Sequence, residues 1–164
     1  MRACMLFVVG LFVGVGLHTV AAQSGDHGPN TNLIAMNHVA MNVPNFDETL
    51  NYYKNVLGFP EAFVVKNPDG TPRLAYVQIS KNTFVEISPS MNGAPASYNH
   101  FGIHVEKLAP VVAMFQARGA KVAAGNASPT KAVLGNITDL NGLRIELAEL
   151  PPESLHRQAM ERWK

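Results

Sequence analysis

Two histidines and two glutamates occupy matching positions in this 164-residue chain. The histidines are His38, in the segment NHVAMNV at 37–43, and His100, 62 positions later in the segment NHFGIHV at 99–105. Each is followed by a lone carboxylate in an apolar run, Glu86 in FVEI and Glu146 in RIEL. A buried unpaired carboxylate is costly, and a divalent cation shared by two Glu and two neutral His removes that cost. The pattern therefore predicts one divalent-metal site with the ligands His38, Glu86, His100 and Glu146.

The alternation of side chains along a strand places these residues on a common face. Residues two apart in a strand share a face. The apolar residues at 39, 41, 43, 101, 103 and 105 are expected to pack under covering helices, which directs the intervening side chains toward a cavity. The residues that then face inward are His38, Ala40, Asn42, Glu86, His100, Gly102, His104 and Glu146.

Each of these residues, taken singly, has a simpler interpretation. A lone strand histidine is usually hydrogen-bonded, and a lone glutamate on an edge strand usually faces solvent. The recurrence of the same pair in both halves favours the metal site. His104 is either a substrate-contact or proton-transfer group or a polar wall residue, and the sequence leaves both open. His27 and His156 are expected to be solvated.

An internal repeat predicts the elements that position these side chains. Apolar residues at helical spacing over 47–57 and over 109–117 are each followed by a glycine that ends the helix. Strand-like runs follow at 74–80, 83–88, 132–137 and 143–150. This order predicts an α+β fold in which two repeated βαβββ modules form a curved mixed sheet around a cavity. Residues 151–164 are expected to form a C-terminal helical tail.

The N-terminal residues differ in composition from the rest of the chain. A single arginine precedes an uncharged apolar run over 3–17, and small residues at 20–22 precede a polar segment. This pattern predicts a signal peptide over residues 1–22, and hence export to the periplasm or the exterior. An uncleaved N-terminal membrane anchor is the alternative. Residues 23–34, rich in Gly, Asn, Asp and Ser, are expected to form a flexible leader.

Cleavage at this point would leave a chain with no net charge and no thiol. The full sequence has 13 Lys and Arg, 12 Asp and Glu and one cysteine, and Arg2 and Cys4 both lie within the signal peptide. We therefore expect no nucleic-acid partner, no stable membrane association after cleavage, no disulfide and no Cys-based metal site. Imidazole and carboxylate ligands suit Zn, Ni, Co, Mn or Fe and do not choose among them.

The chain resembles the vicinal oxygen chelate superfamily, which includes glyoxalase I, fosfomycin-resistance proteins, methylmalonyl-CoA epimerase, extradiol dioxygenases and bleomycin-resistance proteins. The resemblance covers residues 35–150, with module one at 35–89 and module two at 97–150. It is carried by the segments NHVAMNV, YYKNVLGF, FVEI, NHFGIHV and DLNGLRIEL. His38, Glu86, His100 and Glu146 match the four-ligand set of glyoxalase I. Asn42 and Ser90 stand where glyoxalase I has residues that help hold glutathione, which argues against that substrate.

The resemblance implies a metal-dependent lyase or isomerase, similar to glyoxalase I, that acts on a small oxygen-chelating substrate. Either Glu86 or Glu146 would move a proton between adjacent carbons, and Glu146 is preferred. Asn42, His104 and Arg144 are the expected substrate contacts. The alternative is a protein of the bleomycin-resistance type that sequesters a small molecule without catalysis. Relatives pair their modules within one chain or between two, and we expect a homodimer.

Overall fold

The computed structural model describes residues 32–164 except 124 and 126. The predicted signal peptide, 1–22, and most of the predicted leader, 23–34, lie outside the described residues. The first strand begins at Leu33. No helix among the described residues is long and apolar enough to cross a membrane.

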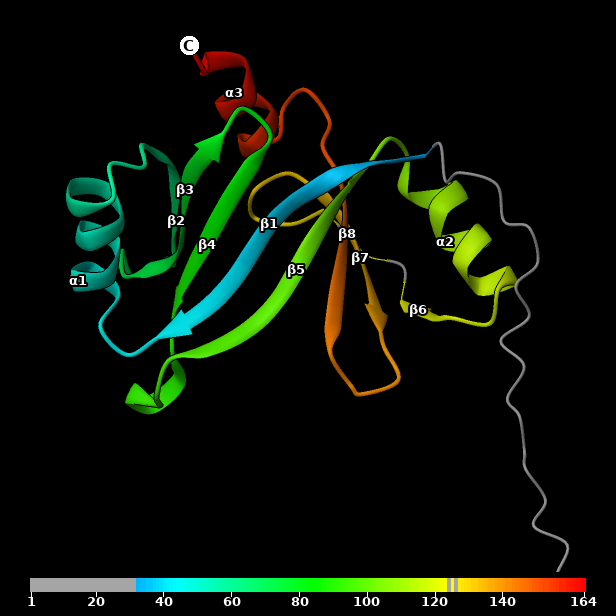
Figure 1. Cartoon of the computed structure of the whole chain (residues 1–164), viewed down its shortest axis with the longest axis horizontal. Coiled ribbons are helices and arrows are strands. Elements are labelled where there is room, and N and C mark those ends of the chain that lie inside the picture. Colours follow the sequence, from blue (N-terminus) through cyan, green and yellow to red (C-terminus); the bar gives the residue numbers. More distant parts are fainter. Residues whose placement is uncertain (1–31, 124, 126) are drawn as a thin grey trace, which may run out of the picture.

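Eight strands form one curved sheet. The first half contributes β1 (Leu33–Val43), β2 (Glu61–Lys66), β3 (Pro72–Ser80) and β4 (Thr83–Pro89), and the second contributes β5 (Ser97–Val105), β6 (Lys121–Ala123), β7 (Val133–Thr138) and β8 (Arg144–Glu149). Their order is β2-β3-β4-β1-β5-β8-β7-β6, with β1 and β5 at the centre (Figure 1). β1 is parallel to β4, β5 is parallel to β8, and β1 and β5 are antiparallel. The predicted α+β fold with two repeated modules in a curved mixed sheet is confirmed.

Helices cover the outer face of each half of the sheet (Figure 1). α1 (Phe46–Asn51) continues into a π-helical turn (Tyr52–Val56), and α2 (Leu108–Ala117) is its counterpart in the second half. A short 3₁₀ turn (Met91–Gly93) lies between the modules. Under α1 the buried cluster is Val43, Phe46, Ala75, Val77, Val85 and Ile87, and under α2 it is Val105, Leu108, Val111, Val112, Ile137 and Leu147. These apolar positions alternate with inward-facing ones, so each strand separates an outer core from an inner surface.

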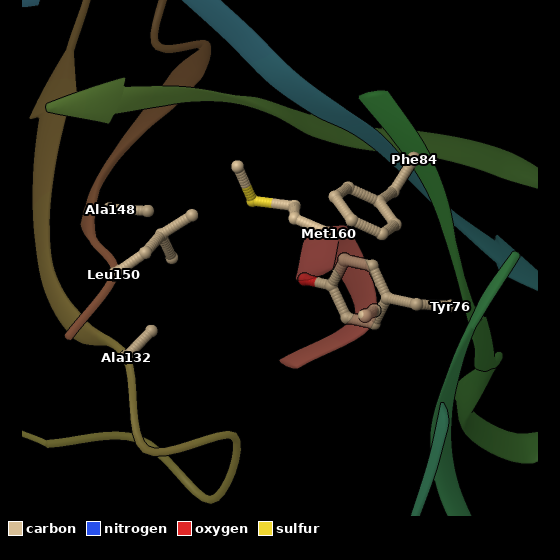
Figure 2. Close-up of a cluster of buried hydrophobic side chains, with 7 residues drawn as sticks. Tyr76, Phe84, Ala132, Ala148, Leu150 and Met160 are labelled. Carbon is tan, nitrogen blue, oxygen red and sulfur yellow. The ribbon is translucent and has the colours of Figure 1, made fainter. Parts of the chain in front are cut away.

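A third helix, α3 (Leu155–Arg162), packs on the inner face between the modules. Figure 2 shows Met160 of this helix between Ala148 and Leu150 on one side and Tyr76 and Phe84 on the other. The guanidinium of Arg157 donates to the Leu150 carbonyl at 3.2 Å, and that of Arg162 donates to the Ala62 carbonyl at 3.2 Å. The helix therefore contacts both modules and closes part of the concave side.

Candidate metal centre

The four predicted ligands meet on the inner face of the four central strands. His38 comes from β1, Glu86 from β4, His100 from β5 and Glu146 from β8. Their exposed fractions are 0%, 8%, 2% and 7%. The Nε2 atoms of His38 and His100 are 2.9 Å apart. His38 Nε2 lies 3.7 Å from Glu86 Oε2 and 3.5 Å from Glu146 Oε1, and His100 Nε2 lies 3.8 Å from an oxygen of each carboxylate.

The separations of 2.9 to 3.8 Å bracket those of donors that share a metal ion. Two ligands held about 2.1 Å from one ion at tetrahedral or octahedral angles are about 3.0–3.4 Å apart. One ligand atom from each of His38, Glu86 and His100 lies within 4.8 Å of the others, so this triad could hold a metal ion. Glu146 lies next to both imidazoles of the triad. Two nitrogen and two oxygen donors with no thiolate form a set that suits first-row divalent metals.

Asn37 orients the imidazole of His38. Asn37 is fully buried, and its Nδ2 donates to the Asn82 carbonyl at 3.5 Å. Its Oδ1 lies 2.8 Å from His38 Nδ1 and therefore accepts the proton on that nitrogen, which leaves the lone pair of Nε2 free for a metal. Burial, followed by the neighbouring His100, lowers the pKa of His38 well below 6.5. His38 is then neutral, which is the form that binds a metal.

In the second module Asn99 and His100 correspond to Asn37 and His38, and Arg144 contacts both of them. Asn99 Oδ1 lies 3.1 Å from His100 Nδ1 and accepts from Arg144 Nη2 at 2.7 Å. Arg144 Nη2 also contacts His100 Nδ1. Asn42 Oδ1 accepts from Asn99 Nδ2 at 3.1 Å. The predicted substrate contacts Asn42 and Arg144 thus form a polar chain beside the metal centre.

Tyr76 holds Glu86 in place, and this role was not predicted from the sequence. Its hydroxyl donates to Glu86 Oε2, and Ser88 Oγ donates to Glu86 Oε1 at 3.3 Å. Burial and then the Glu86 carboxylate raise the pKa of Tyr76 well above 10, so the phenol keeps its proton. Its position on β3 opposite Glu86 could have been found by applying strand alternation to β3.

A pocket of about 190 Å³ opens onto this centre. It is lined by Arg73, Leu74, Tyr76, Glu86, His100, Ser128, Pro129, Thr130, Leu134, Arg144, Glu146 and His156. This volume is below the roughly 300–1,000 Å³ of pockets for drug-sized ligands. The enclosed part of a ligand must therefore be small.

Two further buried histidines lie near α3. His156 is 2% exposed and lines the pocket, so the expectation that it is solvated is wrong. The apolar stripe of the tail gave the signal, because His156 shares a helix face with Ala159 and Met160. The structure does not bring His104 to this pocket; His104 lies in a separate one with Lys81, Asn82 and Arg157 among its lining residues. Burial, followed by Arg157, lowers the pKa of His104 to about 4.

Solved structures with the same fold include several methylmalonyl-CoA epimerases. One from Mycobacterium tuberculosis is 17% identical, covers 77% of this chain and 95% of its own, and gives a TM-score of 0.65. A selenomethionine epimerase is 19% identical, with coverages of 75% and 99% and a TM-score of 0.62. An epimerase in complex with methylmalonyl-CoA and NH₄⁺ is 13% identical, with coverages of 74% and 98% and a TM-score of 0.63. At these identities the likeness shows the fold alone.

Sequence comparison assigns the family. No curated protein sequence matches this chain. The model of the "Glyoxalase/Bleomycin resistance protein/Dioxygenase superfamily" matches residues 35–147. This match covers more than half of the chain and includes all four predicted ligands. The chain therefore belongs to this superfamily, the vicinal oxygen chelate group that its repeated segments resemble.

Proposed function

We propose that this protein is a metal-dependent lyase or isomerase, similar to glyoxalase I, that moves a proton between adjacent carbons of a small oxygen-chelating substrate. The observation that carries the proposal is the convergence of His38, Glu86, His100 and Glu146 on one buried point beside a pocket. These four residues would hold one divalent ion of Zn, Ni, Co, Mn or Fe. The bound ion would act as a Lewis acid toward two neighbouring substrate oxygens.

The surroundings of the two carboxylates favour Glu146 as the group that carries the proton. Glu86 accepts hydrogen bonds from Tyr76 and Ser88, which fix its position. Among the described residues, Glu146 contacts the two imidazoles and receives no comparable hydroxyl hydrogen bond. A carboxylate with fewer fixed partners can move toward a substrate carbon, take its proton and return it to the next carbon.

The pocket favours a small substrate with negative charge. Arg144 lines the pocket, and its Nη2 atom contacts Asn99 and His100. The guanidinium can also pair with a substrate carboxylate. Arg73 lines the same pocket. Several structural neighbours are methylmalonyl-CoA epimerases, and an epimerase inverts a carbon centre. This chemistry supports an isomerase of the same general class, with the substrate left to be identified.

Solvent deuterium exchange tests the proposal. The protein purified without chelator is expected to contain about one metal ion per chain, as measured by elemental analysis. In D₂O it should incorporate deuterium next to the carbonyl of small 2-hydroxycarbonyl compounds, as followed by proton NMR. Glu146→Gln should abolish the exchange while the far-UV circular dichroism stays unchanged. A stable protein free of metal, or a Glu146→Gln variant with undiminished exchange, would contradict the proposal; the first result favours a sequestering protein without catalysis.

We further propose that the protein is exported and forms a homodimer. The apolar run after Arg2 supports export, and N-terminal sequencing of secreted protein should begin at Gln23. In the structure all four candidate ligands lie together within one chain, so the proposed metal centre would not need exchanged modules. Light scattering after size-exclusion chromatography should nevertheless give twice the mass of the mature chain.

A further inference from the structure

A second pocket, of about 400 Å³, lies between α3 and the turn that joins β3 to β4. Among the residues that the structure describes, this pocket shares none of its lining with the pocket at the metal centre. Its volume falls within the roughly 300–1,000 Å³ of pockets that hold small ligands. This second pocket can therefore take a ligand of its own.

His104 is a buried polar residue in the wall of this second pocket. It lies near the end of β5 and is 4% exposed. The described residues supply no hydrogen bond to its ring. Its two nitrogens are nevertheless not among the fully buried polar atoms that lack a partner, whereas both nitrogens of His156 are. The ring of His104 can therefore be reached from the pocket, and a ligand there can supply the missing hydrogen bond.

The ring of His104 offers an N–H donor to such a ligand. Burial and the positive charge of Arg157 lower the pKa of His104 to about 4, so the imidazole is neutral near pH 7. A neutral imidazole carries one N–H, and its proton can sit on either nitrogen. The nitrogen that faces the ligand can therefore donate a hydrogen bond to an oxygen atom.

Two cationic side chains line the same pocket. Arg157 donates from Nε and Nη2 to the Leu150 carbonyl at 3.2 Å, which leaves further N–H donors of the guanidinium for a ligand. Lys81 is exposed, and neither cation forms an ion pair with another described residue. Glu161 also lines the pocket, so two positive charges stand against one negative charge. The lining therefore favours an anionic ligand.

Hydrogen bonds from below hold the turn that forms one wall of the pocket. The Lys81 carbonyl accepts from Gln78 Nε2 at 3.1 Å, and the Asn82 carbonyl accepts from Asn37 Nδ2 at 3.5 Å. Gln78 and Asn37 are both buried. A wall that is supported in this way keeps its shape before a ligand binds, which lowers the cost of binding.

We propose that this pocket is a second ligand site, separate from the metal centre, that binds a small organic anion. The carboxylate or phosphate head group of the ligand accepts a hydrogen bond from His104 and pairs with Arg157 and Lys81. Ile34 and Met160 also line the pocket, and they contact a short apolar body of the ligand. The inference is independent of the metal and of the proposed reaction, because none of these residues belongs to the metal centre.

Calorimetric titration of the full-length protein with hexanoate, hexyl phosphate and hexanamide tests this site. At least one of the two anions is expected to bind, and the tighter of the two identifies the head group. Hexanamide has the same apolar body without the charge, so it should bind at least about tenfold more weakly. Added salt should weaken the binding of the anion, because Lys81 is exposed to solvent.

Three variants locate the bound anion. His104→Phe keeps an aromatic ring and removes both nitrogens, so it should weaken binding about tenfold. Lys81→Gln removes one charge from an exposed turn and should weaken binding about threefold. Arg73→Gln is the matched control, because it removes a charge from the pocket at the metal centre, and it should leave the affinity for the anion unchanged.

Three results would overturn the inference and leave the proposed function standing. They are no binding of either anion, equal binding of hexanamide, and an affinity that is lost in Arg73→Gln but kept in Lys81→Gln. The last result would place the anion at the metal centre instead. Lys81→Gln changes an exposed side chain, so the test remains decisive even if His104→Phe fails to fold.

Discussion

Replacing Gly102 by alanine is expected to abolish metal binding without removing a ligand. Gly102 lies opposite His38 in the pairing of β1 with β5. A Cβ atom on Gly102 would lie 2.1 Å from Cε1, 2.5 Å from Nδ1 and 2.7 Å from Nε2 of His38. Ordinary contacts begin at 3.4 Å, so the imidazole would have to move by about 1.3 Å. Metal–ligand distances tolerate only about 0.2 Å, so the displaced ring no longer fits the other donors.

The expected magnitudes separate this effect from general destabilisation. Gly102→Ala should lower metal affinity by at least about 100-fold, the upper end of the loss seen when a group that supports a ligand is removed. Overpacking should also lower the free energy of unfolding of the metal-free protein by about 1–3 kcal/mol. Titration of Zn²⁺ against a competing chelator measures the first quantity, and urea unfolding in EDTA measures the second.

Gly135→Ala is the matched control. Its Cβ would lie 3.0 Å from Cδ1 of Leu108, the end of a flexible side chain on α2, and 3.3 Å from the Ala123 carbonyl oxygen. This variant should lose stability to a similar or smaller extent and keep the metal affinity of the wild type. A folded Gly102→Ala protein that binds Zn²⁺ as tightly as the wild type would refute the position of His38 against β5, and with it the proposed centre.

Two further predictions concern the histidine rings. Asn37→Ala removes the acceptor for His38 Nδ1 and should weaken metal binding by about 10–100-fold in the same chelator titration. Asn37→Asp keeps an acceptor oxygen and should lose less metal affinity. An equal loss of affinity in both variants would argue that Asn37 does not set the tautomer of His38. Burial lowers the pKa of His156 to about 3 from 6.5. Below pH 6.5 the unfolded chain therefore binds a proton that the folded chain does not, and the free energy of unfolding decreases as the pH falls. His156 should lower the free energy of unfolding by about 2 kcal/mol between pH 7 and pH 5. Urea unfolding in EDTA should therefore show a smaller pH dependence of this free energy in His156→Phe than in the wild type. The same pH dependence in both proteins would contradict the burial of a neutral ring.

Local rules were sufficient to predict which strand residues face inward. His38, Glu86, His100 and Glu146 occur in strands whose alternate residues are apolar, and alternation depends on neighbouring residues alone. The repeat then indicated that both halves contribute to one place. Strict alternation fails at Asn99, which should face away from His100 but accepts a hydrogen bond beside it. The register of β1 and β5 shifts between Ala40 and Met41, and such a shift depends on the partner strand.

Features that depend on long-range packing were not predicted. The short strands β2 and β6 are the two edge strands of the sheet, and their sequences show no strong alternation of apolar residues. The tail was predicted as a helix, but its sequence does not say which surface it covers. Burial of His156 and the hydrogen bond from Tyr76 to Glu86 both depend on where α3 and β3 meet the rest of the chain.

The donors of the two modules are equivalent, but their surroundings are not. His38 Nδ1 contacts Asn37, whereas His100 Nδ1 adjoins both Asn99 and Arg144, and α3 places His156 beside His38. Four equivalent donors alone would let a chelating substrate bind in two opposite orientations, with either carboxylate facing its reacting carbon. Unequal flanks would favour one of these orientations, so the proposed reaction would be stereospecific. Arg144 and α3, rather than the metal and its ligands, would then set the chirality of the product.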